Sequence, residues 1–130
     1  MMLCDFAQSI NGKLYIIGGA WNQVQRPPGV RAFAVHVAVK LSIPWDLANH
    51  RMNMALRMLT DESDPVDVGA GPVEATGQFE VARGLGLRQG TPLLSTFALP
   101  IALADLNAGG YVFELRIGDR IVATEPFTVA

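Results

Sequence analysis

Hydrophobic and polar residues alternate with a period of two along most of the chain, which is the pattern of half-buried β-strands. The segment 31–41 is the clearest case. Its first face carries Phe33, Val35, Val37, Val39 and Leu41, and its second carries Ala32, Ala34, His36, Ala38 and Lys40. Similar runs occupy residues 3–8, 13–18, 51–60, 73–81, 93–99, 111–117 and 120–129. The pattern predicts about eight strands.

Turn signals separate these runs. Asn11-Gly12 is typical of a two-residue hairpin loop, and Pro100 should end the strand that begins at Leu93. Pro44, early in a polar stretch, favours one short helical turn near residues 44–50. The run 51–60 is also compatible with a helix, because Met, Leu, Arg and Ala are good helix formers. Its alternation and the surrounding strands favour a strand.

The last hairpin turns at Gly118-Asp119, which suggests a type II′ loop. Pairing across such a loop places Val122 opposite Leu115 on the inner face. Pro126 cannot donate to a strand ladder, so a bulge or a sheet edge is expected there. The sequence therefore predicts an all-β fold, a two-sheet antiparallel β-sandwich, and 130 residues suit a single domain over residues 1–130.

Composition adds a shortage of charge. Charged residues make up 17% of the chain, against about 25% in an average globular domain. The net charge is −2 and the mean hydropathy is +0.27. We expect neither nucleic acid nor a membrane as partner, because no basic cluster and no apolar run of spanning length is present. With one cysteine and no signal-peptide pattern, a cytoplasmic location is expected.

The alanine-rich face of the segment 31–41 is unusual for a solvated strand, which normally carries Thr, Lys, Glu or Arg. Alanine is a poor strand former, so its repetition indicates that something packs closely over this face. The cover could be a loop, the turn that contains Trp45, or another subunit. The residues of this candidate interface are Ala32, Ala34, His36, Ala38 and Trp45. A symmetric subunit contact would bring His36 near its own copy and make assembly sensitive to pH.

Catalytic and metal-binding patterns are weak. Cys4 could act as a nucleophile only with a histidine base, and His36 and His50 are the two histidines. No zinc spacing and no phosphate-binding glycine motif occurs, so we expect no cofactor and no transition metal. The acidic loop 61–67 carries clustered carboxylates that could hold a hard cation, although its spacing is not that of an EF-hand.

Several segments together resemble a family of short, uncharacterised bacterial proteins described as a domain of unknown function. The similar segments are residues 3–8, 12–21, 33–35, 77–81 and 109–119. The resemblance implies an immunoglobulin-like sandwich and no known activity. The closing hairpin differs from the family pattern, because Gly118-Asp119 stands where relatives usually carry Asp-Gly.

These observations favour a non-enzymatic sandwich that acts by self-association, as a homo-oligomer, or by binding an unidentified protein partner. One alternative is a small-ligand or cation-binding module that uses the acidic loop 61–67. A second alternative is a small hydrolase that uses Cys4 and His36.

Overall fold

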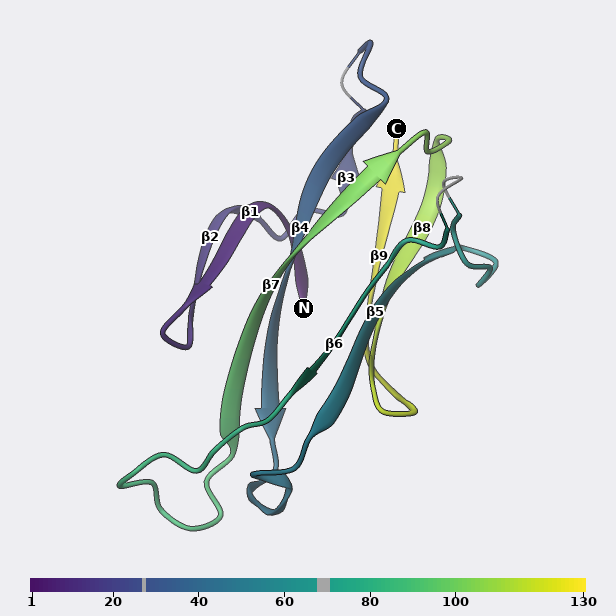
Figure 1. Ribbon diagram of the computed structural model, residues 1–130. Coiled ribbons are helices and arrows are strands. Elements are labelled where there is room, and N and C mark those ends of the chain that lie inside the picture. Colours follow the sequence, from purple (N-terminus) through teal and green to yellow (C-terminus); the bar gives the residue numbers. More distant parts are fainter. Residues whose placement is uncertain (27, 68–70) are drawn as a thin grey trace.

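The computed structural model describes residues 1–26, 28–67 and 71–130. These residues form nine strands in two sheets that pack face to face (Figure 1). The first sheet has the order β2-β1-β4-β7 and the second has the order β3-β9-β8-β5-β6. The strands of the first sheet are β1 (Met2–Ile10), β2 (Lys13–Gly19), β4 (Ala32–Ile43) and β7 (Leu93–Ala104). Those of the second sheet are β3 (Gln23–Val24), β5 (Met52–Thr60), β6 (Glu74–Phe79), β8 (Gly109–Ile117) and β9 (Arg120–Val129). The predicted all-β two-sheet sandwich is confirmed.

The core lies between the sheets and is built by the alternating faces that the sequence displays. From β4, the side chains of Val35, Val37 and Val39 are almost fully buried. The second sheet opposes them mainly with Met54, Leu56, Met58, Phe113, Leu115, Phe127 and Val129. Residues 52–60 are thus a strand and not a helix, because alternation buries every second side chain against the facing sheet.

The loops follow the predicted turn chemistry. Asn11 and Gly12 both have positive φ, of 51° and 74°, as a type I′ hairpin loop requires. A 3₁₀ turn occupies Trp45–Leu47, inside the helical turn expected near residues 44–50. The strand β3 is only two residues long and was not predicted, since so short a segment has no period to detect.

Two predictions are wrong, one about the end of a strand and one about the register of a hairpin. The strand that begins at Leu93 does not end at Pro100 but continues to Ala104. Proline is tolerated there because β7 is an edge strand, whose one ladder partner among the described residues is β4. Val122 does not lie opposite Leu115: the register shifts between Leu115 and Arg116, so Ala123 becomes the partner and Val122 stays exposed.

The edge expected near Pro126 is present. Among the described residues, β9 has a partner on its side away from β8 only at Thr128 and Val129, where β3 runs parallel to it. Phe127 and Val129 point into the core, as expected. Pro27 and residues 68–70 lie outside the described residues.

Candidate protein-binding surface

The hairpin β1–β2 leaves the first sheet and forms an arm across its outer face. β1 pairs with β4 only from Met2 to Cys4 and then pairs only with β2. Further along β1, the Ser9 hydroxyl lies 2.7 Å from the Thr96 hydroxyl and also donates to the Thr96 carbonyl at 3.1 Å. Because Thr96 belongs to β7, the arm must pass over β4, and Figure 1 shows it on the far side of β4 from the N-terminus.

This arm is the cover that the sequence predicted over part of the alanine-rich face. Cys4 and Ala7 of the arm pack on Ala38 of β4 in a small buried cluster. The exposed fraction of Ala38 is 2%. Trp45 lies apart from this face, because it packs with Ile43 and other residues at one end of the sandwich. The cover over Ala38 is therefore the hairpin β1–β2 and not the turn that contains Trp45.

The rest of the face is exposed or only partly buried. Ala32 and Ala34 of β4 are exposed, and their partners on β7 are Ala104 and Ala102. Pro100 is opposite His36 and is also exposed. We call this surface the alanine face, and it consists of Ala32, Ala34, His36, Ala98, Pro100, Ala102 and Ala104. None of these side chains carries a fixed charge, and most are small, so the surface is flat and apolar.

The arm and the alanine face meet in a shallow groove. The ring of Phe6 lies over His36, with 5.0 Å between the ring centroids. The Nδ1 atom of His36 is 3.2 Å from the carbonyl oxygen of Asp5, which fixes the imidazole beside the arm. The groove has a volume of about 380 Å³ and includes Pro100 and Ile10 on its walls. The packed rings of Phe6 and His36 thus lie at the edge of the alanine face.

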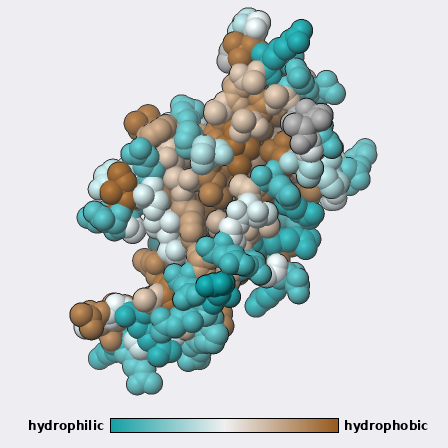
Figure 2. Space-filling view, viewed as in Figure 1, coloured by the Kyte–Doolittle hydropathy of each residue, from teal (hydrophilic) through white to brown (hydrophobic). Residues whose placement is uncertain are grey.

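The arm itself exposes large apolar side chains on both of its strands. The exposed fractions are 39% for Phe6, 46% for Ile10, 54% for Tyr15 and 66% for Ile17. Figure 2 shows hydrophobic surface over β4 and β7 and further hydrophobic groups over the hairpin β1–β2. An exposed apolar edge strand such as β2 is a template for contact with another chain.

The outer face of the second sheet is different. Glu114 accepts hydrogen bonds from Arg57 at 2.9 Å and from Arg116 at 2.8 Å. These two guanidinium groups lower the pKa of the Glu114 carboxyl, with Arg116 the stronger influence. Across the next strand pair, Arg57 is opposite the exposed Glu74. This face therefore has the charged character of an ordinary solvated sheet, and the alanine face does not.

The two residues of the hydrolase alternative are neighbours, but their contact is not catalytic. Cys4 and His36 are cross-strand partners, yet the Cys4 Sγ donates to the backbone carbonyl of His36 at 3.4 Å and not to its ring. Burial, followed by the charge of Asp5, raises the pKa of the Cys4 thiol. A buried thiol without an adjacent base is a poor nucleophile, since the thiolate is the reactive form. His50 binds the carbonyl of Ala48 at 2.9 Å.

The acidic loop 61–67 begins with a tight turn. The backbone of Thr60 accepts from the Ser63 amide at 2.9 Å, and its hydroxyl accepts from the Asp64 amide at 3.2 Å. Nowhere in residues 1–26, 28–67 and 71–130 do three or more His, Cys, Asp or Glu side chains form a group that could hold a metal ion. Within the same ranges, no helix is long and apolar enough to cross a membrane.

The β7 half of the alanine face was not predicted from the sequence; it consists of Ala98, Pro100, Ala102 and Ala104. A signal for it was present, because these residues alternate with Phe97, Leu99, Ile101 and Leu103. The period of two continues through Pro100, and reading proline as a strand terminus hid it.

Comparison with known proteins gives a family but no activity. One family model matches residues 1–130, and its description is "Family of unknown function (DUF6941)". Searches of the curated proteins and of the solved structures found no match.

Proposed function

Because the chain belongs to the Family of unknown function (DUF6941), whose description assigns no activity, we propose from its surface that it is a binding protein. Its function in this proposal is non-enzymatic: it associates with a second copy of itself through the alanine face and the adjoining arm. An unidentified protein partner of similar surface chemistry is the alternative occupant of the same surface.

The contrast between the two outer faces carries the proposal. Both faces belong to one sandwich, but one presents the Arg57, Glu114 and Arg116 cluster and the other presents Ala32, Ala34, Pro100 and Ala102 without charge. Only 17% of the residues are charged, and none of these lies on the alanine face. Interfaces between proteins are depleted of charge at their centres, which the alanine face matches.

Small side chains favour a close sheet-to-sheet contact. Stacked sheets pack about 10 Å apart, and alanines present no long side chain that must be ordered before contact. Two alanine faces related by a two-fold axis would bury Ala34 and Ala102 at the centre. The arms would lie at the rim, where Phe6 and Ile10 add apolar area worth about 25 cal/mol per Å².

Substituting the centre of the face tests the proposal. We expect Ala34→Glu and Ala102→Glu each to convert an oligomer to a monomer, because a carboxylate would be buried without a partner. The matched control is Thr76→Glu, which adds the same charge at an exposed site on the outer face of the second sheet. The measurement is molar mass by sedimentation velocity across the micromolar range.

A monomeric native chain at every concentration would contradict the self-association. If Thr76→Glu caused the oligomer to dissociate as readily as Ala34→Glu does, the assignment of the interface to the alanine face would be contradicted.

The proposal includes two finer points. An immunoglobulin-like arrangement is supported by the strand orders β1-β4-β7 and β9-β8-β5, which parallel the orders A-B-E and G-F-C of that fold. It is also supported by the Tyr111 hydroxyl, which donates to the Asn107 carbonyl at 2.7 Å, as in a tyrosine corner. The other point is a cytoplasmic location, which cell fractionation would check.

A further inference from the structure

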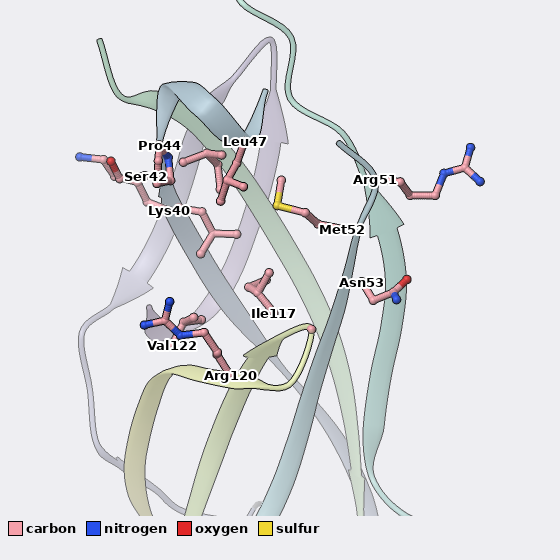
Figure 3. A pocket seen from close by; sticks show the side chains of 13 residues that line it. Lys40, Ser42, Pro44, Leu47, Arg51, Met52, Asn53, Ile117, Arg120 and Val122 are labelled. Carbon is pink, nitrogen blue, oxygen red and sulfur yellow. The ribbon is translucent and has the colours of Figure 1, made fainter. Parts of the chain in front are cut away.

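An apolar groove opens between the sheets at the end of the sandwich opposite the exposed alanines. Its volume is about 630 Å³, within the range of about 300–1,000 Å³ that is usual for ligand sites. Its apolar walls are Leu41, Ile43, Leu47, Met52, Ile117 and Val122. Figure 3 shows Leu47, Met52 and Ile117 around one space between the 3₁₀ turn and the turn that joins β8 to β9.

Two unpaired strand edges border this groove. β1 pairs with β4 only opposite residues 36–38, so in the part of the chain that the structure describes, residues 39–43 of β4 have a ladder partner only on the β7 side. On the other sheet, residues 120–127 of β9 pair with β8 alone among the described residues. The groove therefore lies where each sheet could accept one more strand, and its walls include free backbone N–H and C=O groups of β4.

The vacant position in the first sheet is in line with β1. Met2 lies opposite Ala38, and the two strands are antiparallel. A segment that continued this line past Met1 would lie opposite residues 39–43 of β4. Side chains opposite Leu41 and Ile43 would point into the groove, and those opposite Lys40 and Ser42 would point outward.

The charge at the groove is positive. Lys40 and Arg120 border it, and within the described ranges neither forms an ion pair. Arg51 is a third cation on its wall, but it pairs with Glu80 at 3.6 Å and points away from the space in Figure 3. None of the described lining residues is acidic.

We infer that this groove binds an extended peptide segment with alternating apolar and acidic side chains. The segment adds a strand antiparallel to residues 39–43 of β4. Its apolar side chains fill the space over Ile117 and Met52, and an acidic side chain pairs with Lys40. Backbone hydrogen bonds supply affinity and the alternating pockets supply selectivity, as in other cases of strand addition. This site is separate from the alanine face.

Two N-terminal extensions of the chain test this inference, because they differ only in which of their side chains would point into the groove. A four-residue extension Val-Glu-Val-Glu placed directly before Met1 would set valines opposite Leu41 and Ile43 and glutamates opposite Lys40 and Ser42. The control extension Glu-Val-Glu-Val has the same composition but sends its acids inward, since a shift of one residue exchanges the faces. In residues 39–43, some backbone amides face the vacant strand position beside β4. We expect only the first extension to slow the hydrogen exchange of these amides and to raise the melting temperature of the protein.

A free peptide tests binding in trans. We expect a blocked, fluorescently labelled peptide that alternates valine and glutamate to bind the native chain and to be excluded by the in-phase extension. The variant Lys40→Glu should weaken this binding by roughly two- to fivefold, because one exposed ion pair is lost. A second peptide with N-methylated backbone amides should not bind, since it cannot form the ladder.

Equal effects of the two extensions on exchange and melting would overturn the inference. So would stabilisation by dodecanoate with none by the peptide, because that would make the groove a site for an anionic amphiphile.

Discussion

Cys4 and His36 illustrate how a residue's role depends on which of its atoms makes a contact. They are cross-strand partners, as a nucleophile and its base might be, but the thiol contacts the backbone of His36 and the imidazole contacts the Asp5 carbonyl. Burial raises the pKa of the thiol and disfavours the thiolate. The pair therefore serves to seat the arm on β4.

Glu114 gives a prediction about acid stability. Its folded-state pKa is lowered by Arg116 and Arg57, so its ionised form stabilises the fold above the ordinary carboxyl pKa of about 4.3. That stability is lost as the pH falls through the lower folded-state value. We expect Glu114→Gln to reduce the free energy of unfolding by about 1–3 kcal/mol at pH 7 and by much less in acid.

Urea unfolding of both proteins from neutral to acid pH would measure this effect. Glu62→Gln is the control, because Glu62 is exposed and has no hydrogen bond or ion pair within the described ranges. A difference between Glu114→Gln and the native chain that did not change with pH would contradict the assignment to the ionised carboxylate.

At the scale of elements, the arm β1–β2 is held at both ends, by ladder pairing near Cys4 and by the Ser9–Thr96 hydroxyl contact. We expect the double variant Ser9→Ala, Thr96→Val to open the arm more often, because two hydrogen bonds worth about 1 kcal/mol each are lost. The reactivity of Cys4 with a thiol reagent should then rise by roughly tenfold or more, while the melting temperature changes little.

Thr76→Val is the matched control, because it removes a hydroxyl from an exposed strand position outside the arm. If Cys4 reacted no faster in the double variant than in this control, then β4, and not the arm, would be what shields the thiol.

Two of the strands that the sequence predicted most clearly have a nearly continuous core-facing side. Residues 31–41 and 51–60 alternate along nearly their whole length, and burial of one face fixes them as strands. The departure of β1 from β4 after Cys4 was not predictable, because its own alternation is the same whether it pairs with β4 or crosses it. The register shift at Leu115 has the same cause, since a bulge depends on the partner strand.

The candidate sites divide in the same way. Ala32, Ala34 and His36 were identified from composition within one strand, whereas the groove depends on two vacant ladder positions. Ladder pairing is a relation between distant segments, and no local pattern around Leu41 or Ile43 reports it. The register of β1 and β4 in the structure was needed to derive which side chains of an added strand would point into the groove.

At the scale of the whole molecule, the alanine face and the groove lie toward opposite ends of β4, so the two sites should act independently. Ala34 and Leu41 are seven residues apart, about 23 Å at roughly 3.3 Å per residue. Effects of substitutions at this distance with no shared partners usually add within about 0.5 kcal/mol. We expect the in-phase extension to raise the melting temperature equally in the native chain and in Ala34→Glu. The dimer dissociation constant of the extended chain should lie within roughly twofold of the native value. Sedimentation and thermal unfolding of the four proteins would measure both quantities. If the in-phase extension alone caused the oligomer to dissociate, the subunit contact would lie at the groove. The alanine face would then need a different partner.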